Sequence, residues 1–455
     1  MTTYNLSHTA VGSLLGTNLD AAAKTAIMTA LEAKGLFGAK PVYATPIQQS
    51  FGADPLADMV VLKGALNSLT PSGKNSLILA TSPGANTLTL NGAKAVIAAT
   101  RAGADRIVIN GTAHDTVFAG GGADVIDHTH GSGASFLYGG LGNDTISSGT
   151  GADKIFGDAG NDTLRIFGAG SDTVYGGIGD DNIYDSGTGS SVQYGDAGND
   201  TISSFGGHDT VYGGLGNDVL TDRGSAGSRL EGGDGNDTIT KLGTGSDTIL
   251  GGAGADKLFD NGSGGRSLLD GGLGNDTIRG GGSDTLMGGA GDDNLTAYFG
   301  TGTRLEGGLG NDVMTISTGA DTAYGGVGND VISSTSAGAS YLYGDVGNDI
   351  ISSTGAGSSY LYGGDGTDTI RSGTGDDHLF GGGGNDRFVV SRDPGGHDTV
   401  DGGLGLDTLQ IAAKSTAANV VTSHGTTLIS FADGQTISVT GVETIQFTDK
   451  ILHPH

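Results

Sequence analysis

One acidic position recurs along most of this 455-residue chain at a nearly constant spacing. Segments such as GGLGNDTIS from Gly139 and GDAGNDTLR from Gly157 share one order, with glycine-rich positions first, an acid sixth and an aliphatic residue eighth. A disordered chain does not keep such a register, so the pattern indicates a repeating solenoid. The sixth position is aspartate in all sixteen copies, which lie 17 to 21 residues apart: Asp124, Asp144, Asp162, Asp181, Asp200, Asp218, Asp237, Asp256, Asp276, Asp293, Asp312, Asp330, Asp349, Asp368, Asp386 and Asp407.

A looser copy lies between successive copies, for example SGTGADKIF ending at Phe156, so the unit is about nine residues long. Each unit is a glycine-rich loop followed by a short strand whose central aliphatic side chain points inward. The sequence therefore predicts an all-β solenoid, a parallel β-roll of about sixteen two-unit turns around a thin core. We name the loops that end on the sixteen aspartates first-edge loops and those between them second-edge loops. Gln193 stands at an inward position and predicts a slipped register or a locally wet core.

The first-edge aspartates are spaced as ligands of a metal column. Glycine allows positive φ, so the tight loops can turn their carbonyl groups toward a common point. Stacked strands repeat every ~4.8 Å, so each aspartate lies above the next. Two carboxylates at that spacing repel by roughly 1 kcal/mol in water and more in a protein. Ca²⁺ prefers six or more hard oxygen ligands and Mg²⁺ demands a rigid octahedron, while Zn²⁺ prefers His or Cys. We therefore predict that all sixteen bind Ca²⁺.

The repeat resembles the RTX family, also called hemolysin-type calcium-binding repeats, whose nonapeptide reads G-G-x-G-x-D-x-U-x with U aliphatic. The resemblance covers roughly residues 111–408 and depends on the sixteen copies in register. It implies a secreted β-roll that binds multiple Ca²⁺ ions. It also implies export by a type I secretion system to the exterior or cell surface of a Gram-negative bacterium.

The second-edge loops have fewer acids at the equivalent position. Nine of the sixteen residues there are aspartate and seven are serine or threonine, nearly in alternation. Consecutive aspartates occur at only two places, so most bridging ions would find one carboxylate instead of two. We predict a nearly full calcium column on the first edge and a sparse or weak one on the second, with these second-edge ligands: Asp153, Asp172, Asp377 and Asp398.

Aromatic residues recur at the outward position that closes the strands after the second-edge loops. One interpretation is stacking between turns that shields the thin core. The other is an exposed adhesive face for self-association or for contact with sugars of a cell-surface polysaccharide. The tyrosines of this possible interaction face are Tyr138, Tyr175, Tyr194, Tyr212, Tyr324, Tyr343 and Tyr362.

The two ends of the chain lack the glycine-rich pattern of the repeat. Residues 1–75 are expected to form a small, mainly helical region, with helices over Leu19–Gly35 and around Pro55–Leu69. This region either caps the coil or docks to another subunit or the cell surface. Residues 76–110 are expected to form calcium-free capping turns. Residues 409–455 are expected to form a C-terminal β cap, and the resemblance implies that it carries the type I secretion signal.

Composition excludes several classes of protein. The chain has 50 acidic and 22 basic residues, a formal charge of −28, which is the wrong sign for a nucleic-acid binder. It contains 90 glycines and no cysteine, and the sequence shows neither a run long enough to span a membrane nor an N-terminal signal peptide. The zinc-protease motif H-E-x-x-H is absent and the ten histidines are scattered, so no enzymatic activity is expected.

The repeat makes up most of the chain, so its material properties are the expected function. We predict a secreted, calcium-dependent structural protein that folds on binding Ca²⁺ and self-assembles into a bacterial surface layer, filament or biofilm matrix. Its partners would be further copies of itself, in a homo-oligomer or polymer, and the secretion machinery. The alternative is a monomeric calcium-dependent adhesin that binds host or polysaccharide surfaces.

Overall fold

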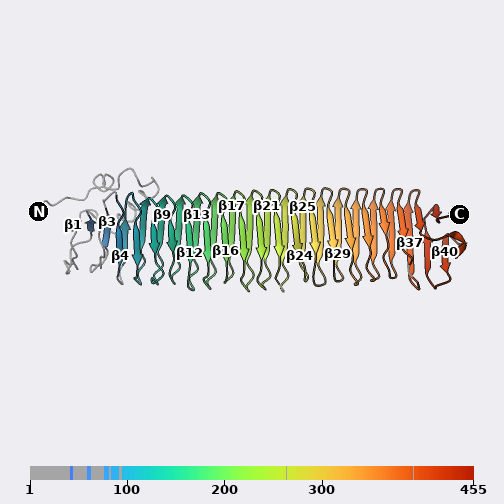
Figure 1. Cartoon of the computed structure of the whole chain (residues 1–455), viewed down its shortest axis with the longest axis horizontal. Helices are drawn as coiled ribbons and strands as arrows, with labels where there is room; N and C mark the ends of the chain where they lie inside the picture. Colours follow the sequence, from blue (N-terminus) through green and yellow to red (C-terminus); the bar gives the residue numbers. More distant parts are fainter. Residues whose placement is uncertain are drawn as a thin grey trace. The chain divides into compact units, whose positions relative to one another are not determined.

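The computed structural model describes residues 41–44, 59–62, 76–80, 84–91, 95–262, 264–392 and 394–454. The chain divides into two compact units, unit 1 (Met1–Gly232) and unit 2 (Gly233–His455), which are described separately. Each is a parallel β-solenoid in which sheet A and sheet B alternate along the chain (Figure 1). The prediction of an all-β solenoid is confirmed, with about 17 turns in all instead of about sixteen.

Unit 1 contributes ten strands to its sheet A and eight to its sheet B, counting the described residues only. The strand β19 (Arg229–Asp234) includes the boundary between the units. The strands of sheet A are β1 (Pro41–Ala44), β2 (Met59–Leu62), β3 (Ser76–Ala80), β5 (Val96–Ala99), β7 (Thr116–Gly121), β9 (Phe136–Leu141), β11 (Lys154–Ala159), β13 (Thr173–Ile178), β15 (Val192–Ala197) and β17 (Thr210–Leu215). The strands of sheet B are β4 (Thr87–Leu90), β6 (Arg106–Ile109), β8 (Val125–Asp127), β10 (Thr145–Ser147), β12 (Thr163–Ile166), β14 (Asn182–Asp185), β16 (Thr201–Ser204) and β18 (Val219–Asp222).

Unit 2 repeats this arrangement and ends in a β cap. Its sheet A consists of β21 (Thr248–Ala253), β23 (Leu268–Leu273), β25 (Thr285–Ala290), β27 (Arg304–Leu309), β29 (Thr322–Val327), β31 (Tyr341–Val346), β33 (Tyr360–Asp365), β35 (His378–Gly383), β37 (His397–Leu404), β39 (Ala418–Ser423), β40 (Thr426–Phe431) and β41 (Thr436–Thr440). Its sheet B consists of β20 (Thr238–Lys241), β22 (Lys257–Asp260), β24 (Thr277–Gly280), β26 (Asn294–Ala297), β28 (Val313–Ile316), β30 (Val331–Ser334), β32 (Ile350–Ser353), β34 (Thr369–Arg371), β36 (Arg387–Val390), β38 (Thr408–Ile411), β42 (Thr444–Gln446) and β43 (Ile451–Leu452). A single 3-10 turn, η1 (Ser415–Ala417), is the helical element of the described residues.

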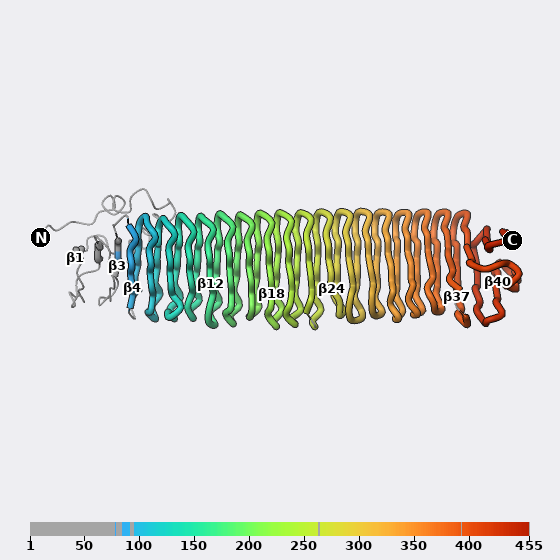
Figure 2. Tube along the Cα trace, in the orientation of Figure 1, coloured from blue at the N-terminus to red at the C-terminus, as the bar shows by residue number. Residues whose placement is uncertain are grey.

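One inward aliphatic side chain per strand builds the core of each unit. In sheet B of unit 1, Ile146 pairs in register with Ile126 on one side and Leu164 on the other, and all three are at most 1% exposed. Successive turns of the trace lie directly beside one another within each unit (Figure 2). The alternation of a strand sends its neighbouring side chains outward, so the core is one layer of aliphatics between two sheets. A one-residue slip would expose that layer, which fixes the register.

A positive φ is required where the first-edge loop leaves sheet A, and most turns place glycine there. Gly140 has φ 110°, and a Cβ there would overlap the carbonyl oxygen of Gly120 in the preceding turn. Three turns place aspartate at the same loop position, with φ of 70° to 73°. Aspartate is one of the few residues that tolerate this left-handed region. The loop shape is therefore kept without glycine at Asp158, Asp196 and Asp345.

The inward Gln193 does not mark a slipped register, so that part of the prediction is wrong. Gln193 pairs in register with Val174 and Val211 on the adjacent turns. Its side chain is fully buried, and its Nε2 donates to Oδ2 of Asp185 at 3.0 Å. Asp185 is also buried and accepts the amide of Gly187 at 2.8 Å. The polar residue is accommodated because the opposite sheet supplies a carboxylate.

Unit 2 holds a second polar pair in its interior. The Lys241 side chain is fully buried, and its Nζ donates to both carboxylate oxygens of Asp260 at 3.1 and 2.9 Å. Its third bond goes to the carbonyl oxygen of Gly264 at 3.1 Å. A buried ammonium group is tolerated only when it is paired and fully hydrogen-bonded, as here.

The ends of the coil differ in part from expectation. Met59–Leu62 forms β2, which pairs in parallel with β1 and β3, so the helix predicted around 55–69 is wrong at these residues. The run Met-Val-Val-Leu is apolar and contains two β-branched residues, which favours a strand. The helix predicted over 19–35 lies outside the described residues. Among the described residues, no helix has the length and apolar character needed to cross a membrane.

The C-terminal residues form the predicted β cap. The strands β39, β40 and β41 pair antiparallel, and β41 joins the solenoid by pairing in parallel with β37. The guanidinium group of Arg392 lies over the ring of Phe431, 3.7 Å from its centroid, and pairs with Asp433. The cap is therefore attached to unit 2 by strand pairing and by this cation–π contact.

Replacing Gln193 by leucine tests the interior pair. Gln193→Leu restores the regular aliphatic pattern but removes a donor from Asp185, so we expect a loss of about 1–3 kcal/mol of unfolding free energy. Urea denaturation of the calcium-loaded chain, followed by circular dichroism, measures it. The double variant with Asp185→Ser, which copies Ser204 on the next turn, should recover stability. Higher stability of the single variant would contradict the role assigned to the pair.

Candidate metal centre

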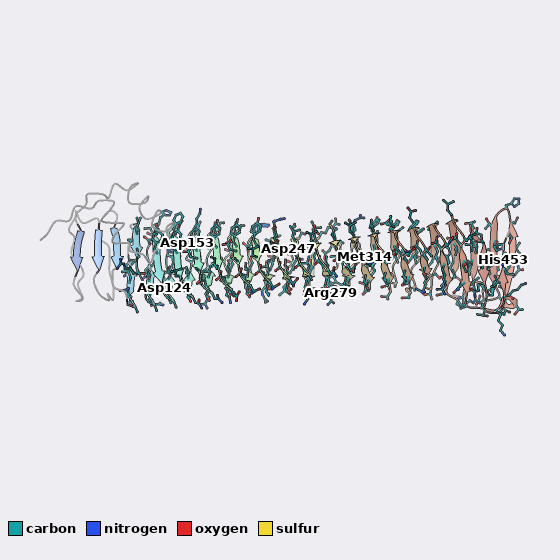
Figure 3. The ribbon with its side chains drawn as sticks, turned by 90° about the horizontal axis from the view of Figure 1, so that it is seen from above. Asp124, Asp153, Asp247, Arg279, Met314 and His453 are labelled. Atoms are coloured by element: carbon teal, nitrogen blue, oxygen red, sulfur yellow. The ribbon has the colours of Figure 1, made fainter. Side chains whose placement is uncertain are left out.

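The sixteen first-edge aspartates occupy equivalent places in the two units. Each ends the loop that leads from sheet A to sheet B, as Asp144 does directly before β10. Each is at most 2% exposed. They are therefore buried carboxylates, one per turn, at the same edge of each solenoid. The second-edge aspartates instead lie at the start of the strands of sheet A, as Asp153 does directly before β11 (Figure 3, where Asp124 and Asp153 are labelled).

In at least fifteen of the sixteen first-edge carboxylates, one oxygen accepts a hydrogen bond from the backbone of the preceding turn. The amide of Asp144 donates to Oδ1 of Asp162 at 2.7 Å, and the amide of Asp162 donates to Oδ1 of Asp181 at 2.7 Å. In unit 2 the amide of Asp312 donates to Oδ1 of Asp330 at 2.8 Å. This ladder fixes the orientation of each side chain, so the second oxygen points in the same direction on every turn.

That second oxygen, Oδ2, is buried without a hydrogen-bond donor in fourteen of the sixteen first-edge aspartates. An unpaired buried acceptor costs about 1–3 kcal/mol, and more when it carries charge. A row of such oxygens therefore requires a cation or a proton between the turns. These residues are Asp124, Asp144, Asp162, Asp181, Asp200, Asp256, Asp276, Asp293, Asp312, Asp330, Asp349, Asp368, Asp386 and Asp407.

A small space lined by oxygens lies beside Oδ2 on turns whose first loop position is glycine, whereas the turn of Asp124 has Ala119 there. It exists because the first loop position is glycine: a Cβ built on Gly139 would overlap Oδ2 of Asp144 and lie 2.9 Å from the carbonyl oxygen of Gly157 on the next turn. The same two kinds of oxygen, a carboxylate and the next turn's carbonyl, surround the equivalent glycines in both units. Examples are Gly157, Gly176, Gly195, Gly251, Gly271, Gly288, Gly307, Gly325, Gly344, Gly363 and Gly381.

These residues fit Ca²⁺ better than the other common divalent ions. The donor set is hard oxygen from carboxylates and backbone carbonyls, in loops of one repeating shape. Among the described residues, no group of three or more His, Asp or Glu side chains gathers at one point, so an ion at this edge would take backbone oxygens as well as carboxylates. Zn²⁺ would require His or Cys, and the chain has no cysteine.

Burial raises the pKa of the first-edge carboxyl groups. Burial, with a smaller contribution from neighbouring carboxylates, raises the pKa of Asp144 to about 8 and that of Asp124 to about 7. In unit 2 the same causes raise the pKa of Asp256, Asp293 and Asp349 to about 7. Without a cation, the folded column therefore holds protons that the unfolded chain would release at neutral pH.

The four second-edge aspartates predicted as ligands receive protein donors at Oδ2. Asp153 accepts from the amide of Gly149 at 3.1 Å and lies 3.2 Å from Nδ1 of His128. The other three accept from a side chain or an amide: Asp172 from Oγ of Ser148 at 3.4 Å, Asp377 from the amide of Gly373 at 2.9 Å, and Asp398 from Nε2 of Gln435 at 3.4 Å. The two edges are thus chemically different, and calcium binding at these four residues stays a prediction.

The carboxylate ladder extends beyond the range read from the sequence. The amide of Asp105 donates to Oδ1 of Asp124 at 2.7 Å, and Asp105 in turn accepts the amide of Asn86 at 2.6 Å. At the other end, in unit 2, the amide of Asp407 donates to a carboxylate oxygen of Glu443 at 2.8 Å. Both residues carry a sequence signal: each follows a Gly-x pair and stands two residues before an inward isoleucine. We missed them because the flanking loops lack the full glycine pattern.

The tyrosines of the predicted interaction face form stacked ladders on sheet A. In unit 1 the row runs from Phe118 to Tyr212, with ring centroids 4.5 to 5.0 Å apart and planes within 10°. In unit 2, Tyr324, Tyr343 and Tyr362 stack in the same way, and a second row that we missed contains Tyr341 and Tyr360. Because neighbouring rings cover each other's faces, the geometry favours stacking between turns over contact with sugars, and the adhesive role stays a prediction.

Aspartate-to-asparagine variants compare the two edges within unit 2. Asp312→Asn keeps the acceptor for the amide of Asp293 but removes the charge, so we expect the number of bound Ca²⁺ ions per chain to fall by about one or two. Asp284→Asn, at a second-edge residue that is not a predicted ligand and whose Oδ2 accepts the amide of Gly281 at 2.9 Å, is the matched control and should leave that number unchanged. Calorimetric titration with Ca²⁺ measures both. Equal losses at the two edges, or equal occupancy of both edges in a calcium-soaked crystal, would refute the asymmetry.

The raised pKa values predict opposite pH responses with and without calcium. In the calcium-free chain, protonated first-edge carboxyls favour the folded state below pH about 4, and this stability is lost as pH rises through about 6 to 8. In the calcium-loaded chain protons compete with the metal, so Ca²⁺ affinity should fall as pH drops through the same range. Circular dichroism against pH, in chelator and in excess Ca²⁺, checks both. A calcium-free chain that gains β structure with rising pH would contradict this reading.

Comparison with known proteins agrees with the loop geometry. The model of the RTX calcium-binding nonapeptide repeat matches the chain in eleven segments between residues 110 and 388. These segments cover more than half of the chain, and RTX repeats bind multiple Ca²⁺ ions. No curated protein matches the chain at a significant level. The buried carboxylates, the glycine-lined oxygen sites and the matched repeat together show that this chain belongs to the RTX calcium-binding repeat family.

Proposed function

We propose that this chain is a secreted structural protein that folds when it binds Ca²⁺ and then self-assembles into a surface layer, filament or biofilm matrix. The observation that carries the proposal is the buried, donor-free Oδ2 repeated on successive turns within each unit. RTX repeats support the coarser statement of a secreted calcium-binding protein. The finer statement rests on how much of the chain the repeat occupies.

Calcium would control folding through the first-edge column. Where free Ca²⁺ is scarce, as in a cytosol, the carboxylates must either protonate or repel, and the solenoid is disfavoured. Bound Ca²⁺ supplies positive charge and accepts the loop oxygens. Because the sites exist only in the folded chain, the binding free energy adds directly to folding stability. The chain's own residues prepare each site: glycine leaves the space, and the amide ladder aims Oδ2 into it.

Export through a type I secretion system fits this behaviour. RTX proteins are substrates of that system and are typically secreted by Gram-negative bacteria. A chain kept unfolded by low calcium can pass through the secretion channel, and millimolar calcium outside the cell would then fold it. The C-terminal cap of unit 2 is the segment in which we place the secretion signal.

A structural role is favoured over a catalytic one. The solenoid of RTX repeats is typically structural or binding in function. The buried polar groups that we described are used in the two interior pairs and in the edge ladders, with each side chain held by neighbouring turns. A monomeric adhesin for host or polysaccharide surfaces is the alternative that the test below separates.

Circular dichroism and electron microscopy of the purified full chain test the proposal. We expect a largely unfolded chain in EGTA, a β spectrum after addition of millimolar Ca²⁺, and ordered polymers in micrographs of the calcium-loaded sample. Magnesium at the same concentration is the control and should not substitute. A chain that is fully β in EGTA would refute calcium-coupled folding. Calcium-folded chains that persist as monomers would refute assembly and favour the adhesin.

A further inference from the structure

The first-edge loops of unit 1 expose a row of aliphatic side chains that the core does not use. These side chains end every second strand of sheet A, at β9, β13 and β17, where Leu141, Ile178 and Leu215 are 57%, 69% and 57% exposed. An apolar side chain left in water at a regular spacing has no role within the solenoid, since the aliphatic core lies between the sheets. Aligned exposed apolar residues mark interaction surfaces more often than scattered ones do.

Large and small residues alternate strictly along this row. Strand pairing places Gly121, Leu141, Ala159, Ile178, Ala197 and Leu215 in register on six successive turns. The two alanines are half-buried between the projecting side chains, so the row alternates knobs and recesses. We name these six residues the alternating stripe of unit 1.

Unit 2 carries the same alternation over four successive turns. Ala253, Leu273, Ala290 and Leu309 pair in register, and the two leucines are 62% and 57% exposed. The pattern then ends, because valines follow at both of the next two positions. Two large side chains can stand on adjacent turns, as the paired Val327 and Val346 do. Steric crowding within the row therefore does not explain the alternation.

From this alternation we infer that the stripe is a docking surface for a second copy of this chain, in antiparallel orientation. A two-fold axis between the turns of Ala159 and Ile178 brings each knob of unit 1 opposite a recess of the other copy. Leu141 then faces Ala197, Ile178 faces Ala159, and Leu215 faces Gly121. All six positions are used, which is the self-complementarity that an isologous two-fold interface requires. The four-turn row of unit 2 satisfies the same rule about its own centre.

The residues beside the stripe suit the rim of such an interface. The fifth loop position is polar on five of the six stripe turns and is Ala123 on the first. The polar residues are Asn143, Asn161, Asp180, Asn199 and Asn217. Successive members are linked by hydrogen bonds, such as the amide of Asn161 to Oδ1 of Asn143 at 3.0 Å. A polar, mostly uncharged row next to an apolar centre is the usual anatomy of a protein–protein contact.

The size of the stripe predicts a weak contact. Six stripe positions and five rim positions give eleven residues a side in unit 1, against roughly 20–30 in a standard stable interface. Pairing is therefore expected only at high protein concentration or between chains already held close together. The inference rests on the proposed function, because it names the surface through which calcium-folded chains would associate.

Substitutions that fill the recesses distinguish specific dimerisation from nonspecific hydrophobic association. The variant Ala159→Leu, Ala197→Leu, Ala253→Leu and Ala290→Leu makes both stripes more apolar but leaves the knobs without recesses. Sedimentation of the calcium-loaded full chain should show the dimer dissociation constant raised by at least about tenfold. Val421→Leu, which enlarges a side chain 51% exposed on β39, is the control and should leave it unchanged. Association as tight as, or tighter than, that of the native chain would overturn the proposal.

Disulfide cross-linking tests the antiparallel register, since the native chain has no cysteine. A mixture of Leu141→Cys chains and Ala197→Cys chains should form the mixed dimer on mild oxidation in Ca²⁺. Leu141→Cys chains alone should not cross-link, because their thiols would lie about three turns, ~14 Å, apart along the stripe. Cross-linking of Leu141→Cys alone would overturn the register. A β spectrum in Ca²⁺ without any dimer would overturn the stripe while leaving calcium-coupled folding intact.

Discussion

A buried carboxylate oxygen without a donor is the feature on which both units depend. It recurs on successive turns because the backbone ladder fixes Oδ1 and thereby aims Oδ2 at the glycine-lined space, as in Asp144 and Gly139. Without a cation this arrangement opposes folding at neutral pH, since burial and neighbouring carboxylates both penalise charge. We propose that the same oxygens become ligands when Ca²⁺ binds. The interaction that destabilises the apo chain is thus the one that would hold the loaded chain together.

The carboxylates of the two edges have different hydrogen-bond partners. At the second edge, His128, Ser148 and Gly373 contact the carboxylates of Asp153, Asp172 and Asp377, whereas Oδ2 of Asp321 is buried without a hydrogen bond. At the first edge the protein supplies one donor per carboxylate and leaves the other oxygen to an ion. We therefore expect metal-dependent folding to depend mainly on the first edge. Alternating serine with aspartate along the second edge also halves the charge that must be compensated there.

Sequence alone predicted the solenoid, its register and the sixteen first-edge aspartates, because one short unit repeats often enough to fix the period. It failed where a residue depends on a partner outside its own unit. Gln193 was predicted to mark a slipped register, because its hydrogen-bond partner, Asp185, lies on the opposite sheet and is not visible in the local pattern. Asp105 and Glu443 were missed because the ladder needs only a carboxylate before a strand, whereas we required the full glycine loop. Strand β2 was predicted as part of a helix because its four residues give only a short local strand signal, and its pairing with β3 is not visible in the sequence.

The position of the alternating stripe links calcium to association. Ile178 stands between Gly176, which lines an oxygen site, and Asp181, whose Oδ2 points into it, so one loop carries both the ion site and the knob. An ion that orders this loop also fixes the spacing of knobs and recesses on which pairing depends. Association in turn favours the ordered loop, because anything that binds only the folded form stabilises it by mass action. Calcium affinity should therefore rise with protein concentration in the native chain, and this dependence should vanish when the recesses are filled.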